Sequence, residues 1–219
     1  MTFKYSCFIS YSHVHGQQLN PVVPTLHDAL KSELSLWFDE DIFMDKERLE
    51  GGDFWHPKLV DALCHSPCMV VLLTPVYFND RHIYCAREFR AMELLEEQRL
   101  TQLGGSVRTQ GLIIPVVCRG AEFLPPGVKT RQLHNFEEML LTSRPQDNPA
   151  FIQKVNRIAR YIRSRYEELI KLSDPCANCS SFEFPDEAEA RHWLQGIRTS
   201  RTGQTVPSRP APFPDREDT

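Results

Sequence analysis

One carboxylate in the sequence falls on the apolar face of a helix pattern. On a wheel of about 100° per residue, Glu88 lies inside the apolar stripe of residues 84–100, and Tyr84 lies one turn before it on the same face. The apolar members of this stripe are Tyr84, Cys85, Phe89, Met92 and Leu95. Because burying an ion without a partner is costly, Glu88 should be neutralised, paired, or directed into a cleft.

Two features keep a structural interpretation of Glu88 open. A carboxylate at the margin of an apolar stripe can pair with a neighbouring arginine, such as Arg87 or Arg90. Glu96 also falls in the stripe two turns later, where the helix is expected to leave the sheet. The wheel alone therefore does not separate a catalytic carboxylate from an ion-paired one.

Hydroxyl and aromatic side chains are expected at the strand ends that face Glu88. A first strand pattern ends in Ser10-Tyr11-Ser12, and a fully apolar run ends at Thr74, shortly before the helix of Glu88. In a doubly wound parallel sheet, ligands bind at the carboxyl ends of the strands, where the strand order reverses. Hydroxyls, a ring and a half-buried carboxylate suit a sugar and a flat base, and they require no metal. Tyr11 and Ser12 are equally consistent with a simple strand end.

Other chemistries lack their motifs in this sequence. There is no GxxxxGK[ST] phosphate loop, no GxGxxG after the first strand, no HExxH and no GxSxG elbow. A phosphoacceptor receiver domain would need an acidic cluster at the strand ends, where Ser10, Tyr11 and Thr74 stand instead.

The 7 cysteines are an odd number and are scattered along the chain. Cys7, Cys68 and Cys118 lie in apolar runs, where cysteine behaves as a small hydrophobic residue. Cys176-Ala177-Asn178-Cys179 is a single CxxC with no second CxxC and no nearby histidine pair. Zinc needs four ligands, or three and a water molecule, so we expect free thiols in a surface loop. This usage favours a reducing cytoplasm.

The elements that position these residues alternate between strand and helix patterns. Such alternation predicts an α/β fold, a doubly wound parallel sheet of four to five strands with helices on both faces. Pro115 removes one ladder donor, which favours an outer strand or a strand end. The expected strands are 4–11, 34–39, 68–74, 112–118 and 133–136, and the expected helices are 21–36, 53–63, 84–100, 151–172 and 186–197.

Composition is that of an ordinary globular protein, with 41% hydrophobic and 25% charged residues. The net charge of −4 lacks the excess of positive charge that nonspecific nucleic-acid binding requires. No apolar run is long enough to span a membrane, and the first residues lack the apolar centre of a secretory signal. We expect one domain over 1–172, an extension over 173–199 and a flexible, proline-rich tail over 200–219.

Four motifs occur in an order that resembles the TIR (Toll/interleukin-1 receptor) domain. The resemblance covers about residues 4–172, and a single short domain of this kind is most similar to bacterial and archaeal members. Tyr84 stands where the family usually has Trp, and the 39–49 loop is longer than usual. The motifs are Tyr5–Ser12 as the first box, Leu49–Trp55 as the LxxGxxW loop, Tyr84–Glu88 as the WCxxE element, and Ile114-Pro115-Val116 in the fourth strand.

The resemblance implies an enzyme that cleaves NAD⁺ at the nicotinamide–ribose bond, with ADP-ribose or a cyclic ADP-ribose as product. Glu88 would be catalytic and would stabilise the positive charge left on the ribose. Substrate contacts would come from Ser10, Tyr11, Ser12, Trp55 and Tyr84, and Trp55 is equally consistent with a core anchor of its helix. No metal or cofactor is implied, because NAD⁺ is the substrate. The activity would serve antiviral defence in the prokaryotic cytoplasm.

Two further functions are consistent with the same motifs. One is a non-catalytic adaptor that acts by TIR–TIR assembly and does not need Glu88. The other is a sensor module whose protein partner recognises the phage, with residues 173–219 as the docking piece. Self-association is expected for the enzyme as well, through Ile42, Phe43 and Met44 in an acidic loop, unless these residues fold back on their own domain.

Overall fold

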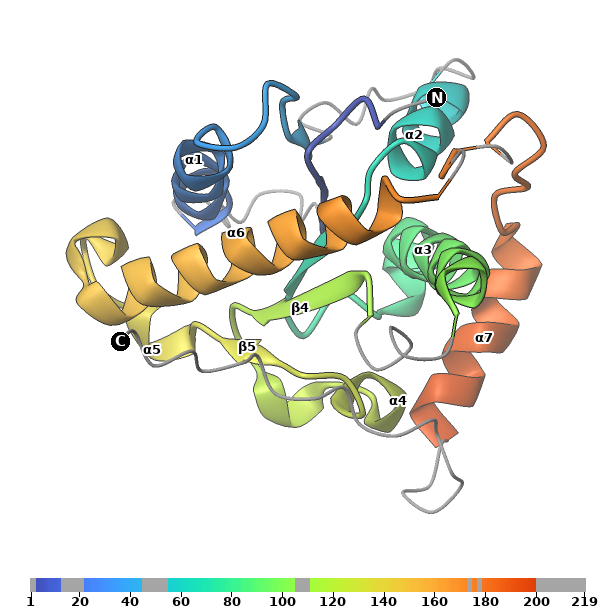
Figure 1. Ribbon diagram of the computed structural model, residues 1–219. Helices are drawn as coiled ribbons and strands as arrows, with labels where there is room; N and C mark the ends of the chain where they lie inside the picture. The colour runs from blue at the N-terminus through green and yellow to red at the C-terminus, as the bar shows by residue number, and fades with distance from the viewer. Residues whose placement is uncertain are drawn as a thin grey trace.

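The computed structural model describes residues 3–12, 22–44, 55–104, 111–172, 175–176 and 179–199. At its centre is one parallel sheet (Figure 1). The strands are β1 (Phe8–Tyr11), β2 (Phe43–Met44), β3 (Met69–Leu73), β4 (Ile113–Val117) and β5 (His134–Asn135). Their order is β2-β1-β3-β4-β5, which reverses direction between β1 and β3. This is the doubly wound, flavodoxin-like order, and it confirms the fold class expected from the sequence.

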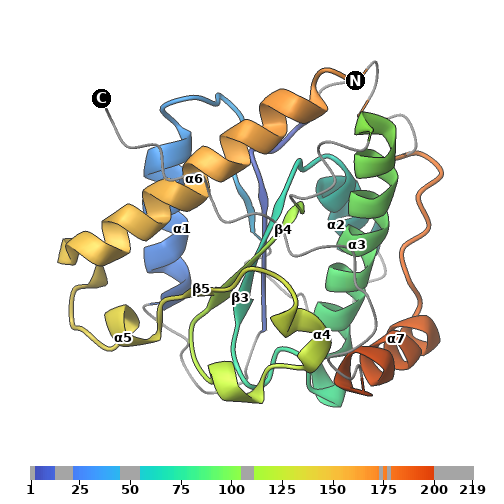
Figure 2. The same ribbon diagram turned by 60° about the horizontal axis from the view of Figure 1, so that its bottom comes forward.

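Helices cover both faces of the sheet. In Figures 1 and 2, α1 and α6 pack together on one face, while α2 and α3 cover the other face and α7 lies outside α3. The α-helices are α1 (Val22–Leu34), α2 (Trp55–Cys64), α3 (Ile83–Leu103), α4 (Pro126–Lys129), α5 (Glu137–Leu140), α6 (Pro149–Leu169) and α7 (Glu187–Thr199). Three short 3₁₀ turns, η1 (Asp80–His82), η2 (Ala121–Phe123) and η3 (Pro145–Asp147), complete the described elements.

The central strands β3 and β4 are buried along their whole length, as expected for strands covered by helices on both faces. Pro115 lies in β4, which is flanked by β3 and β5, so the expected outer position was wrong. Alternate residues of a strand bond to opposite neighbours. Cys118 donates to Leu73 of β3, so Pro115 faces the β5 side. The β5 ladder begins one residue later, where Val116 pairs with His134, and the missing donor is therefore not needed.

The strand expected over 34–39 is not present, and the second strand is β2. Helix α1 continues to Leu34, whose side chain is 1% exposed, whereas Leu36 is 69% exposed in the turn that follows. The alternation of Leu34 and Leu36 imitates a strand, but it marks the last buried residue of a helix and an exposed turn. In β2, Phe43 pairs in register with Phe8 of β1.

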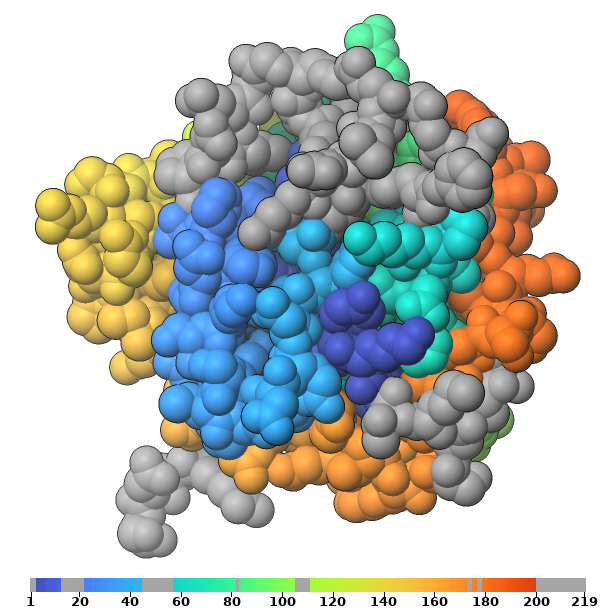
Figure 3. Space-filling view, turned by 90° about the horizontal axis from the view of Figure 1, so that it is seen from above, coloured from blue at the N-terminus to red at the C-terminus, as the bar shows by residue number. Residues whose placement is uncertain are grey.

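The N-terminal residues lie on the surface between the α1–β2 segment and α2, as Figure 3 shows in deep blue. The Lys4 ammonium forms an ion pair with Asp61 of α2 at 2.9 Å. The Lys4 amide also donates to the carbonyl of His65, just beyond α2. These contacts fix the start of the chain beside α2 and lead it into β1.

Helix α7 packs against α3 and α4. The indole of Trp193 lies 5.5 Å from the ring of Phe89 and donates to the Glu93 carboxylate at 2.7 Å. Leu194 is fully buried. The helix expected over 186–197 is therefore present and belongs to the same packed body as α3. The proline-rich tail over 200–219 lies outside the described residues, and no helix of the described part is long and apolar enough to cross a membrane.

Candidate active site

Glu88 lies inside the fold and contacts a hydroxyl of β1. Its side chain belongs to the buried face of α3, and the residue is only 4% exposed. The hydroxyl of Ser10, a residue that is 1% exposed, donates to Glu88 Oε2 at 2.5 Å. The burial of this carboxylate confirms its place in the stripe, and Ser10 brings the first and third predicted motifs together.

Tyr77 extends this contact into a chain of hydrogen bonds. Its phenol oxygen lies 2.6 Å from Ser10 Oγ and 3.3 Å from the carbonyl oxygen of Cys85. A hydroxyl has one proton to donate, so when Ser10 donates to Glu88, the Tyr77 proton is shared between Ser10 Oγ and the Cys85 carbonyl oxygen. The sequence analysis missed Tyr77, which is fully buried. The available signal was a phenol three residues after Thr74, at the same edge of the sheet.

The carboxyl ends of β1 and β3 meet as expected. Ser12 Oγ lies 3.1 Å from Thr74 Oγ1, and both residues are buried. Ser10 and Ser12 share one face of β1, so Tyr11, between them, projects to the opposite face. The Cys85 thiol, on α3, contacts the Tyr11 carbonyl at 3.7 Å. The structure therefore joins Ser10 to Glu88 and Ser12 to Thr74.

Tyr84 is 40% exposed, so its expected place in the buried stripe was wrong. It lies in the first turn of α3, where the chain has just reached the edge of the sheet. The Arg87 guanidinium lies 5.2 Å from the centre of its ring and 4.8 Å from the ring of Phe184 in the extension. Tyr84 is thus a surface ring near Glu88 in sequence, with an environment unlike that of Glu88.

The two neighbouring arginines both contact the C-terminal extension. Arg87 Nε donates to the carbonyl of Pro185 at 2.7 Å. Arg90 lies 3.4 Å from the Glu93 carboxylate and 3.7 Å from that of Glu189. These are ion pairs and hydrogen bonds on the partly exposed side of α3.

Glu96, the second carboxylate of the stripe, has a structural role. It forms an ion pair with Arg131 at 2.9 Å and accepts hydrogen bonds from the amides of Leu112 and Ile113, where β4 begins. Burial lowers the pKa of Arg131, but Glu96 and Glu93 more than offset this, so the pKa is raised overall. Glu96 is thus held by a guanidinium and by backbone amides, and Glu88 accepts a hydrogen bond from a serine hydroxyl.

Trp55 begins α2, as the sequence predicts. The rest of the LxxGxxW loop, from Leu49 to Phe54, lies outside the described residues. The contribution of Trp55 to substrate binding therefore stays a prediction.

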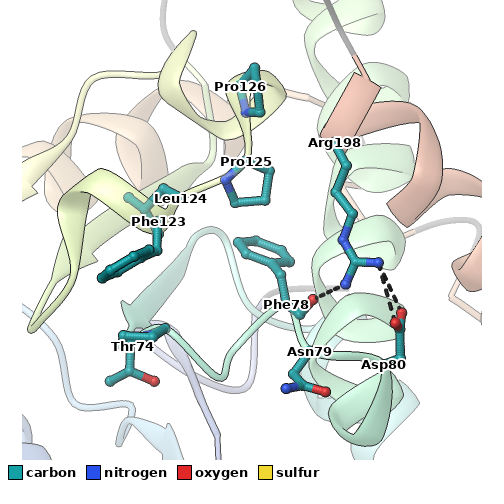
Figure 4. Close-up of a pocket in the computed structure, with 10 residues that line it drawn as sticks. Thr74, Phe78, Asn79, Asp80, Phe123, Leu124, Pro125, Pro126 and Arg198 are labelled. Carbon is teal, nitrogen blue, oxygen red and sulfur yellow. Dashed lines mark hydrogen bonds and ion pairs between the residues drawn. The ribbon is translucent and has the colours of Figure 1, made fainter.

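A hollow of about 380 Å³ lies beside Thr74, on the β4 side of the sheet edge. Figure 4 shows the ring of Phe78 in its wall, with Pro125 opposite. Arg198 of α7 closes one end, donating to the Phe78 carbonyl at 2.6 Å and to Asp80 at 3.0 Å. Glu88 does not line this hollow, so the hollow is adjacent to the predicted site and separate from it.

The cysteines depart from the sequence-based expectation. Cys179 forms a disulfide with Cys64 at the end of α2, and Cys176 is buried. The CxxC is therefore packed against the domain and is not a pair of free thiols in a surface loop. The reason is tertiary: the segment after α6 returns to α2, bringing together residues 115 positions apart.

A family model described as TIR domain matches residues 7–151. The match covers more than half of the chain and contains both Ser10 and Glu88. The chain belongs to the TIR-domain family. No curated protein matches it. The TIR match ends near the start of α6, so α7 and the cysteines at 176 and 179 lie beyond it.

Proposed function

We propose that this TIR domain is an NAD⁺ glycohydrolase or cyclase with Glu88 as its catalytic carboxylate. The observation that carries the proposal is the buried contact between Glu88 and Ser10. It lies near the carboxyl ends of β1 and β3, where the strand order reverses. Ligands of doubly wound sheets bind at this edge. A polar group placed against the local apolar pattern is expected where function, rather than folding, selects the residue.

The chemistry requires a negative group beside the ribose. Breaking the nicotinamide–ribose bond sends the electron pair to nicotinamide and leaves positive charge on the ribose carbon, which a carboxylate stabilises. The hydrogen bond from Ser10 fixes the orientation of the Glu88 carboxylate. Attack by water then gives ADP-ribose and a proton, while attack by the adenine of the same molecule gives a cyclic product.

The remaining predicted residues take different parts in this proposal. Ser10 and Ser12 are both 1% exposed, so in the described form they position other groups, and they would contact substrate only if the site opens as it must for Glu88. Tyr84, with 40% exposure, offers a ring for a flat base. By the resemblance, the output would be NAD⁺ loss or a cyclic signal in cytoplasmic antiviral defence.

Access to Glu88 sets a condition on the mechanism. At 4% exposure, the carboxylate cannot contact a ribose without movement of the residues that cover it. TIR domains commonly self-associate, and we propose that assembly opens the site in this protein. The described form would then be a resting state of low activity.

The same burial favours a second function. A carboxylate that is 4% exposed and bonded to Ser10 could simply stabilise α3 against β1. In that case the domain would be a non-catalytic adaptor that acts by TIR–TIR assembly alone.

The deciding experiment measures nicotinamide release from NAD⁺ by the purified full chain. We expect release by the wild type and its loss in Glu88→Gln, by at least about 10²–10³-fold, the typical effect of removing one charge-stabilising group. The matched control is Glu97→Gln, an exposed carboxylate on the same helix, which should retain activity.

Two outcomes would contradict the enzyme proposal. Near-normal turnover by Glu88→Gln would remove the catalytic role of this residue. No release by the wild type at any protein concentration, together with unfolding of Glu88→Gln, would favour the adaptor.

A further inference from the structure

Four side chains of metal-ligand type converge where the extension meets α2. The ligand atoms of His65, Cys176 and Cys179 all lie within 4.8 Å of one another. Cys64 is bonded to Cys179, so its sulfur lies in the same cluster. Figure 1 shows the segment after α6 passing beside α2. Three sulfurs and one imidazole are a ligand set typical of structural zinc sites.

The imidazole of His65 is held as a metal-bound histidine usually is. Its Nδ1 lies 2.9 Å from the main-chain oxygen of Asp61 and 3.1 Å from the Asp61 carboxylate. When Nδ1 donates its proton to these acceptors, the lone pair lies on Nε2. Metal-ligating histidines almost always donate their other N–H to a carbonyl or carboxylate, which fixes tautomer and ring orientation. His65 is also buried, at 5% exposure.

The CxxC segment has a compact turn. The amide of Cys179 donates to the carbonyl of Cys176 at 3.0 Å, so the chain reverses between the two cysteines. A C-x₂-C spacing supplies two ligands of a structural zinc site, and a second segment supplies the others. Here the second segment is Cys64-His65, which the sequence could not place beside the CxxC because it is more than a hundred residues away.

The buried guanidinium of Arg99 lies beside the cluster, and nearby negative charge would stabilise it. Arg99 is 2% exposed, and its described hydrogen bonds go to the carbonyls of Ser66 and Cys64. Its Nε has no hydrogen-bond partner among the residues that the structure describes. Three thiolates and one Zn²⁺ carry a net charge of about −1, which would offset a buried guanidinium that is otherwise costly.

We propose that, when its cysteines are reduced, the protein binds one Zn²⁺ through Cys64, His65, Cys176 and Cys179. The metal fastens the extension that carries α7 to the end of α2. This site is independent of NAD⁺ cleavage and does not rest on the proposed function. In a reducing compartment zinc would replace the disulfide, because disulfides rarely persist in the cytosol.

The disulfide and the zinc site exclude each other, since both use Cys64 and Cys179. To pass from one to the other, the disulfide takes two electrons and two protons from a thiol reductant, which becomes a disulfide itself. Zinc then binds as the three thiols release their protons to solvent. No other group needs to be oxidised or reduced.

The test uses the full chain purified with a phosphine reductant and without chelators. We expect about one zinc per chain by elemental analysis, and a lower melting temperature after the metal is removed with a chelator. Cys176→Ser is the informative variant, because it removes one ligand and leaves the Cys64–Cys179 pair intact. It should lose zinc, while the control Cys118→Ala, a buried cysteine outside the cluster, should keep it.

Cobalt provides a second measurement that does not depend on the variants folding. Co²⁺ added to metal-free, reduced wild type should give the absorption of a tetrahedral thiolate site, displaced by Zn²⁺. Wild type that takes up neither metal would overturn the proposal and leave the disulfide as the only link. Full zinc content in Cys176→Ser would overturn it as well, because the metal would then be bound elsewhere.

Discussion

Ser10 connects the groups around Glu88, because its hydroxyl contacts both the carboxylate and Tyr77. These three side chains come from β1, α3 and the segment after β3. Their hydrogen bonds therefore fix the position of α3 relative to the sheet at the point where the proposed chemistry occurs. A change at Tyr77 should therefore reach Glu88 through Ser10 and through the Cys85 carbonyl on the same helix.

We predict that Tyr77→Phe lowers kcat for NAD⁺ cleavage about fivefold and leaves KM unchanged. The substitution keeps the ring and removes the hydroxyl that contacts Ser10 and the Cys85 carbonyl. The contact with Ser10, which orients Glu88, is worth about 1 kcal/mol. The control is Tyr161→Phe on α6, which removes a partly buried hydrogen bond from the Tyr161 hydroxyl to the Gly111 carbonyl at 2.6 Å. Equal losses of stability in both variants with no change in kcat would give Tyr77 a structural role only.

His134 should make the stability of the domain depend on pH. Burial, followed by the charges of Lys154 and Arg157, lowers its pKa from 6.5 to about 4. The folded state therefore binds fewer protons than the unfolded state between these values. Stability is complete above pH 6.5 and is lost as pH falls toward 4, by roughly 3 kcal/mol at most.

Urea unfolding at about pH 7 and about pH 4.5 measures this contribution. In His134→Asn, the loss of unfolding free energy between the two conditions should shrink. His192→Asn, at an exposed position of α7, should behave as the wild type does. An identical pH dependence in all three proteins would show that carboxylates, rather than His134, set the acid sensitivity.

At the scale of elements, β2 illustrates how a surface expected for a partner can belong to the core. The ring of Phe43 lies 5.2 Å from that of Phe8 and 5.1 Å from that of Tyr5, and Ile42 is 8% exposed. The expectation of an exposed apolar loop was therefore wrong for these residues, which fold back on their own domain. Because acidic residues surround them and the strand is short, the sequence pattern did not predict this edge strand.

We predict that Phe43→Asp lowers the free energy of unfolding by roughly 1–3 kcal/mol, because it removes two aromatic contacts and places a charge beside β1. Phe123→Asp is the matched control, since Phe123 is 70% exposed and should tolerate the change. Urea denaturation of both variants gives the comparison. A Phe43→Asp protein as stable as wild type would show that Phe43 does not stabilise the domain through these ring contacts.

Long elements with strong periodicity could be predicted from the sequence, and contacts between distant segments could not. The apolar run of β3 and the stripe of α3 determine their own structure, so Glu88 was found as an exception within a clear pattern. Tyr77 and the Cys64–Cys179 pair have no local pattern, because tertiary packing alone brings them to their partners. Tyr84 was misplaced because a wheel treats the first turn of a helix like its centre.

At the scale of the whole molecule, the extension reaches the helix that carries Glu88. Arg87 contacts Pro185 and Phe184, and Trp193 packs on Phe89 of α3. The extension is thus joined to α3 on the side opposite the sheet. Whatever displaces α3 during opening of the site must also act on α7.

The last prediction concerns how this closed molecule becomes active. Since Glu88 is 4% exposed, a single chain in the described form should be a poor enzyme, and assembly should supply the energy that opens it. Specific activity should therefore rise with protein concentration or with a crowding agent. A dilution series followed by nicotinamide release, with oligomeric state measured by light scattering on the same samples, checks this. Activity that stays constant while the oligomers dissociate would mean that each chain opens its own site.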